Sequence, residues 1–176
     1  MNSIEKWFGK LEVIFLRLSQ IALVFMMILT TLDALSRHLL NKSITGAYEV
    51  TEMYLMVILV FLSMSYVQKV DGHIRLDIIF ERLSKRVQDI LNIFFYLLAA
   101  AMMFFIGYQG FHMTMNAWQN NLIASGLINF PLWLSYIWIP IGSFLIMIRL
   151  ILLVILLALG KDVYVHNSES EEVDFE

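Results

Sequence analysis

The sequence predicts an all-α integral membrane protein with four transmembrane helices, and three observations lead to this fold class. Hydrophobic residues make up 60% of the 176 residues, charged residues 15%, and mean hydropathy is +0.75, whereas a soluble domain is about half apolar and about a quarter charged. Residues 90–148 contain no Asp, Glu, Lys or Arg, a run too long for a soluble core. The apolar runs do not alternate over about ten residues as barrel strands do. We therefore expect one compact helical unit, residues 1–161, that crosses a bilayer.

The N-terminal segment is expected to form an amphipathic helix that leads into the first span. Apolar residues recur at helical spacing over residues 3–16, with charged residues between them, which is typical of a helix at the membrane interface. The apolar run at residues 17–38 is long for a signal peptide and ends at Asp33 and Arg37. We therefore expect a retained membrane helix.

Three further spans are expected, separated by polar connections. The turn "NKSITGA" precedes the second span, and an apolar stripe at helical spacing over residues 74–87 predicts a second interfacial helix before the third. The last span exceeds what a ~30 Å hydrocarbon core requires at ~1.5 Å per residue. It must tilt, begin late near Pro140, or extend out of the bilayer. The expected second, third and fourth spans are residues 48–68, 89–111 and 132–159.

Basic residues predict on which side of the membrane each loop lies, because cytoplasmic loops carry an excess of Lys and Arg. They gather before the first span, between the second and third, and after the fourth, whereas the connection between the third and fourth has none. Four spans with both termini in the cytoplasm satisfy this bias. Residues 162–176 carry acidic residues and no Lys or Arg, so we expect a disordered, solvated cytoplasmic tail.

Ionisable residues at membrane depth are few, and each is a candidate for a structural or subunit contact. Asp33 and Arg37 are four apart, which favours a local ion pair, although a contact with a partner subunit stays open. Glu49 and Glu52 open the second span, where carboxylates complement the helix dipole; a cation cage needs several more oxygen ligands. Arg149 has no acidic neighbour one turn away. Its side chain must extend to the headgroups, meet a lipid phosphate, or meet an acceptor on another helix or subunit.

The sequence excludes several kinds of functional site, and two other classes of membrane protein have to be considered. There is no cysteine, so disulfides and thiolate chemistry are excluded, and no phosphate loop, HExxH motif or Gly-rich dinucleotide turn is present. We expect no catalytic, metal or cofactor site. The alternative is a haem-bearing membrane anchor of a respiratory enzyme, with His38 and His112 as haem ligands. A standalone exporter would need polar midplane residues, which the sequence lacks.

The segment around the second span carries a family resemblance. Glu49 opens the span, an apolar run follows, and a Gly-His-Ile-x-x-Asp turn with Gly72, His73 and Asp77 leads into the amphipathic helix. Arg37 after the first span and the last-span segment "YIWIPIGSFLIMIRLILLVILL" fit the same pattern. Nearly the whole chain thus resembles the small membrane subunit of tripartite ATP-independent periplasmic (TRAP) transporters, the DctQ-like family.

The resemblance implies a non-catalytic scaffold, or small permease, subunit of a sodium-coupled importer. The substrate would be an organic acid such as a C4-dicarboxylate or a sialic acid. A periplasmic binding protein would deliver it, and a large membrane subunit would carry the substrate and sodium sites. The small subunit would pack on the stationary part of the large one, in the bacterial or archaeal inner membrane. Because the two subunits are fused in some members, the acidic tail fits an unfused version.

The polar segment "KVDGHIRLD", residues 69–77, is interpreted as a hinge. Its His has no nucleophile or metal partner in the sequence, which favours a structural role over a catalytic one. Gly72 would allow a bend from a spanning helix into a flat one, and His73 and Asp77, one turn apart, would brace it. The neighbouring basic residues are candidates for contacts with phospholipid headgroups: Arg75, Arg82, Lys85 and Arg86.

Overall fold

Four long apolar helices dominate the computed structural model, which describes residues 2–70, 84–124, 126 and 129–159. The helices long and apolar enough to span a bilayer confirm the predicted all-α membrane fold; they cover Trp7–Leu40, Ala47–Lys69, Lys85–Gln119 and Trp133–Ala158. The elements are α1 (Asn2–Leu40), α2 (Ala47–Glu49), the π-helix η1 (Val50–Leu55), α3 (Met56–Lys69), α5 (Lys85–Gln119), α6 (Trp133–Tyr136) and α7 (Trp138–Ala158).

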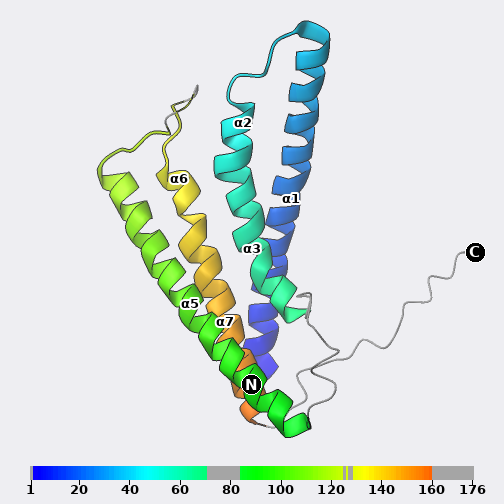
Figure 1. The fold of residues 1–176 in the computed structure, drawn as a ribbon, viewed down its shortest axis with the longest axis vertical. Coiled ribbons are helices and arrows are strands. Elements are labelled where there is room, and N and C mark those ends of the chain that lie inside the picture. The colour runs from blue at the N-terminus through cyan, green and yellow to red at the C-terminus, as the bar shows by residue number, and fades with distance from the viewer. Residues whose placement is uncertain (1, 71–83, 125, 127–128, 160–176) are drawn as a thin grey trace, which may run out of the picture.

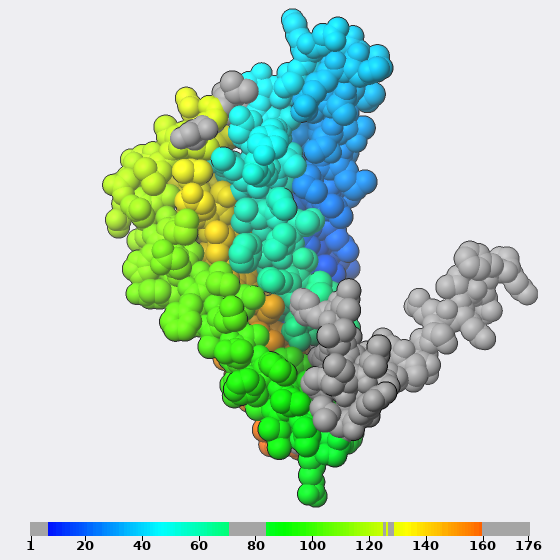
Figure 2. Space-filling view, viewed as in Figure 1, coloured from blue at the N-terminus to red at the C-terminus, as the bar shows by residue number. Residues whose placement is uncertain are grey.

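The long helices stand in a row, in the order α1, α3, α7, α5 (Figure 1). Successive spans run in opposite directions, so the start of α1 and the end of α7 lie together at what we call the termini end. The connection at residues 41–46 and the described residues of the connection after α5, 120–124 and 129–132, lie at the opposite, loop end. In the most apolar part of the fourth span, Trp133–Ala158, 44% of residues are buried, against 11% in the most apolar part of the first span, Trp7–Leu40. The reason is that α7 packs against both α3 and α5, and in the view of Figure 2 these neighbours cover much of it.

Residues 2–40 form one continuous helix; the sequence predicted an amphipathic helix over 3–16 that leads into a first span over 17–38. Its 39 residues reach about 58 Å at ~1.5 Å per residue, well beyond a ~30 Å hydrocarbon core. Phe8, Glu12 and Ser19 are buried and lie on one helical face. The polar residues that suggested an interfacial helix are therefore partly packing residues.

The α5–α7 contact depends on small residues. A Cβ added to Gly110 would lie 2.7 Å from Cγ2 of Ile139, and one added to Gly107 would lie 3.2 Å from Cβ of Ser143. Small residues let membrane helices approach closely enough for dispersion contacts, because lipid supplies no hydrophobic drive between helices. Pro140 lies in the first turn of α7, where its missing N–H costs no helical hydrogen bond.

The α3–α7 crossing is tighter still. A Cβ added to Gly142 would lie 2.6 Å from the carbonyl carbon of Phe61, so the two backbones themselves are in contact. Beside this crossing, α5 and α7 enclose the buried core of Tyr96, Ala100, Ile146, Leu150 and Leu153. The close crossing sets the position of α7 within the row.

Candidate functional site

A buried ion pair joins α1 to α7 in the half of the molecule nearer the termini end. Arg149 donates from Nε to Oε1 of Glu12 at 2.7 Å and from Nη2 to Oε2, so the contact is bidentate. Ser65 on α3 donates its hydroxyl to the same Oε1 at 2.7 Å. The side chains of Arg149 and Glu12 are 3% and 0% exposed. We call Glu12, Ser65 and Arg149 the three-helix network.

The three-helix network satisfies its charges internally. Fork-shaped bidentate geometry is the strongest form of a guanidinium–carboxylate contact, and buried charges are tolerated only when paired and hydrogen-bonded. The Phe8 ring lies 5.3 Å from the Arg149 guanidinium carbon and adds a cation–π contact. Since α1 packs against α3 and α3 against α7, the network adds a direct link between α1 and α7.

The network answers the question that Arg149 raised in the sequence. Of the three options for its side chain, the structure shows an acceptor on another helix of the same chain. Sequence reasoning missed Glu12 because it was counted among the charged residues of an interfacial helix. A signal was present: Phe8, Glu12 and Ser19 follow the spacing i, i+4, i+11 of one packing face.

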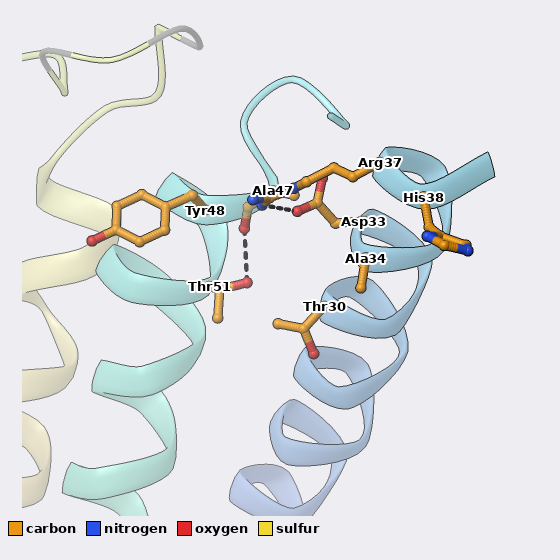
Figure 3. Close-up of a pocket in the computed structure, with 8 residues that line it drawn as sticks. All are labelled: Thr30, Asp33, Ala34, Arg37, His38, Ala47, Tyr48 and Thr51. Atoms are coloured by element: carbon orange, nitrogen blue, oxygen red, sulfur yellow. Dashed lines mark hydrogen bonds and ion pairs between the residues drawn. The ribbon is translucent and has the colours of Figure 1, made fainter. Parts of the chain in front are cut away.

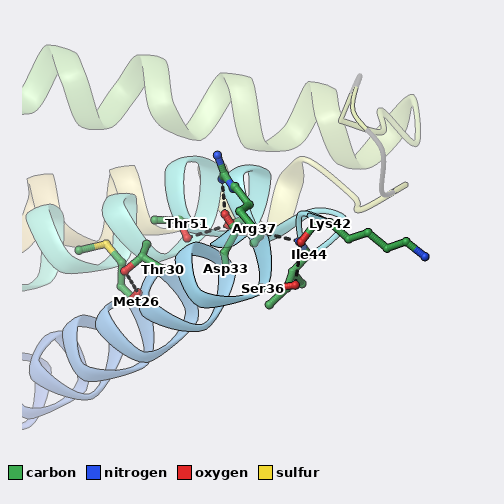
Figure 4. A network of polar contacts seen from close by, with 9 residues as sticks. Met26, Thr30, Asp33, Ser36, Arg37, Lys42, Ile44 and Thr51 are labelled. Atoms are coloured by element: carbon green, nitrogen blue, oxygen red, sulfur yellow. Dashed lines mark hydrogen bonds and ion pairs between the residues drawn. The ribbon is translucent and has the colours of Figure 1, made fainter. Parts of the chain in front are cut away.

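Asp33 ties the loop end of α1 to the following connection (Figure 4). Its Oδ1 accepts a hydrogen bond from the Ile44 backbone N–H at 2.7 Å, and its Oδ2 accepts one from Arg37. Ser36 donates to the Lys42 carbonyl at 2.7 Å. The ion pair expected between Asp33 and Arg37 is present, whereas the role of Asp33 in holding the 41–46 connection was not foreseen.

A cleft of about 560 Å³ opens at this end between α1 and the start of the second span (Figure 3). The Asp33 carboxylate on its wall is already bound by Arg37 and Ile44. Thr51 donates to the Ala47 carbonyl at 2.7 Å. Among the described residues, no group of His, Asp and Glu has the arrangement of a metal site. The cleft is lined by Thr30, Asp33, Ala34, Arg37, His38, Ala47, Tyr48 and Thr51.

The second span contains a π-helical stretch that contacts α6 and the connection before it. Ser135 donates to the Met53 carbonyl, and Tyr54 donates to the Pro131 carbonyl at 3.1 Å. Glu49 is half-buried, with its Cγ 2.9 Å from a Cβ added to Gly126, whereas Glu52 is exposed. The two carboxylates that the sequence placed together thus have different surroundings. π-Helical turns are frequent at functional sites, and here the turn lies where the second and fourth spans meet.

The remaining sequence candidates are distributed as follows. Lys85 and Arg86 are exposed at the start of α5, at the termini end (Figure 1). His38 and His112 lie on α1 and α5, the two edges of the row, so the structure does not bring these imidazoles together around a haem. The hinge residues and two headgroup candidates lie outside the described residues: Gly72, His73, Arg75, Asp77 and Arg82.

Replacing Asp33 with Ala is expected to loosen the 41–46 connection. The change removes the acceptor of the Ile44 N–H and leaves Arg37 without its carboxylate, and losing such an acceptor costs about 1–3 kcal/mol. Hydrogen exchange followed by mass spectrometry should show faster exchange in residues 41–46. Asp89→Ala, the same change near the start of α5, is the control; equal exchange in the two variants would contradict the role of Asp33.

The fold and the network define the class: a multi-pass membrane protein whose buried charges hold its own helices together. The family model for the DctQ component of tripartite ATP-independent periplasmic transporters matches residues 26–160, more than half of the chain. The chain belongs to this family and is a small permease subunit of a TRAP transporter, as its resemblance predicted. It is also similar to the ectoine TRAP transporter small permease protein TeaB of Halomonas elongata, with 26% identity over 168 residues, which are 96% of this chain and 84% of the relative.

Proposed function

We propose that this subunit acts as a non-catalytic scaffold for a large membrane subunit that carries the substrate. One observation supports this role: each buried charged residue of the described chain, namely Glu12, Asp33 and Arg149, has an internal partner. Carriers bind their substrates through polar groups near the midplane on interrupted helices. A subunit whose buried charges all hold its own helices is suited to support a moving partner.

We further propose that the complete system imports an organic acid with a sodium gradient and receives it from a periplasmic binding protein. The family's systems in general combine a large membrane subunit and a binding protein, and the resemblance to this family is the ground for expecting sodium coupling and an organic acid. The relative from Halomonas elongata is named for ectoine, so ectoine joins C4-dicarboxylates and sialic acids among the compounds to test.

Reconstitution tests the scaffold role. The chain should co-purify with its large subunit in mild detergent, and sodium-driven uptake into liposomes should require both membrane subunits and the binding protein. Glu12→Ala should lower complex yield and uptake in parallel, because it disrupts the scaffold, whereas Asp89→Ala, near the start of α5, should lower neither. Uptake by this chain without the large subunit would refute the scaffold role.

We also propose that the termini end faces the cytoplasm. Of the exposed basic residues that the structure describes, Lys10, Arg17, Lys69, Lys85 and Arg86 lie toward that end, while Arg37 and Lys42 lie at the loop end, in line with the positive-inside bias. The chain has no cysteine, so Asn41→Cys and Ser84→Cys each provide a single label site. A membrane-impermeant maleimide added to spheroplasts should label the Asn41→Cys variant and spare the Ser84→Cys variant; the reverse pattern would contradict this orientation.

A further inference from the structure

An unpaired guanidinium lies on the exposed face of α1. Arg17 is exposed, and within the described part of the chain it has no hydrogen-bond or ion-pair partner. It lies five residues further into the span than Glu12, and its neighbours at one-turn spacing are uncharged. A positive charge at this depth requires an anionic partner or a path to the headgroups. Its Cα–Cβ bond tilts toward the helix N-terminus, so its side chain is directed toward the membrane surface at the termini end.

A shallow, open apolar groove between side chains of α1 begins at this charge. Its volume is about 530 Å³, and it continues from Arg17 and Gln20 along one face of α1 to Ile28. The apolar side chains along it are well exposed: Ile21 65%, Val24 55%, Phe25 53% and Ile28 52%. The groove therefore has a polar end and an apolar remainder.

The dimensions of the groove match one leaflet. Arg17 and Ile28 are eleven residues apart, or about 16 Å at ~1.5 Å per residue, and half of a ~30 Å hydrocarbon core is about 15 Å. The exposed Lys10 lies two turns before Arg17 on the same face, which adds a second positive charge on the headgroup side. A phospholipid of the leaflet at the termini end has the same order of parts, with an anionic headgroup at the surface and acyl chains toward the midplane.

We propose that Arg17 and this groove bind an anionic phospholipid of that leaflet, with its phosphate on the guanidinium and an acyl chain along Ile21, Val24 and Ile28. The proposed occupant is a lipid because the groove changes from polar to apolar in the same direction as the leaflet does. It is an anionic lipid because the polar end of the groove, at Arg17, is positively charged. A basic residue near the surface strengthens the attraction to anionic lipid by about fivefold, so the groove should prefer phosphatidylglycerol to phosphatidylcholine.

The absence of cysteine allows a site-specific test. Met27, exposed beside the groove, is replaced by Cys and labelled with a fluorophore in the full-length chain in nanodiscs. A small fraction of acyl-brominated phosphatidylglycerol should quench this label more than the same fraction of brominated phosphatidylcholine. Arg17→Gln should abolish the difference and Arg17→Lys should keep it. A label at Phe105→Cys, on the exposed face of α5, should show no difference.

Three results would overturn the proposal. Equal quenching of the label at position 27 by both lipids would show that the groove has no preference for anionic lipid. The anionic partner of Arg17 would then be a carboxylate of a partner protein. If the difference in quenching between the two lipids persists in Arg17→Gln, the preference for anionic lipid does not depend on the guanidinium. A difference of equal size at position 105 would show general enrichment of anionic lipid around the chain rather than a groove.

Discussion

Glu12→Ala is expected to cause the largest loss of stability of any single change at a charged residue of the described chain. The substitution leaves the Arg149 guanidinium, 3% exposed, without its carboxylate, and removes the acceptor of Ser65. Breaking a buried ion pair by removing one partner costs about 3–5 kcal/mol, because the remaining charge stays desolvated. The purified chain in mild detergent should unfold at a markedly lower temperature, or at a lower denaturant fraction, as followed by helical circular dichroism.

Two variants separate the ion pair from other effects of this substitution. Glu52→Ala removes an exposed carboxylate and should change stability by less than about 0.5 kcal/mol, as is usual at the surface. The double variant Glu12→Leu with Arg149→Met replaces the pair with apolar groups, which is often neutral or stabilising. Its stability should exceed that of Glu12→Ala. If Glu12→Ala were as stable as the unaltered chain, the three-helix network would have no structural role.

The fold could be predicted from the sequence because, in a membrane protein, the hydropathy pattern shows where most of the membrane spans lie. Backbone groups in lipid must be satisfied within helices, so each long apolar run marks one span, and the expected second span differs from Ala47–Lys69 by a residue at each end. The first span was harder to delimit. Charged residues at its start suggested an interfacial helix, but a polar residue near a helix end can face either a headgroup or another helix.

The partners of the polar residues were less accessible to sequence reasoning. The Asp33–Arg37 pair was predictable because both residues lie on one helical face, four residues apart. The Arg149–Glu12 pair joins residues 137 positions apart, and its existence depends on how α1, α3 and α7 cross. Helix order in a row is set by close contacts such as Gly142 against Phe61, and spacing along one chain does not encode which helices meet.

Gly142→Ala is expected to be the most damaging of the glycine substitutions. The added methyl would lie 2.6 Å from the carbonyl carbon and the Cβ of Phe61, and a helix backbone cannot move aside as a flexible side chain can. Overpacking of this kind costs about 1–3 kcal/mol, and separating α3 from α7 would also strain the network at Ser65 and Arg149. Alanine is the better helix former by about 1 kcal/mol, so helix propensity alone would make the variant more stable. A net loss of stability must therefore come from the steric conflict with Phe61.

Gly9→Ala is the matched control for this prediction. Gly9 is also helical and buried, but a Cβ there would lie 3.0 Å from Nζ of Lys69, the mobile end of a long side chain. That variant should be as stable as the unaltered chain or slightly more stable, because the gain in helix propensity remains and the amine can move away. Thermal unfolding in the same detergent should therefore order the two variants with Gly142→Ala clearly below Gly9→Ala. Equal stabilities would mean that α3 and α7 have room for a methyl group, and that the close crossing does not fix the helix row.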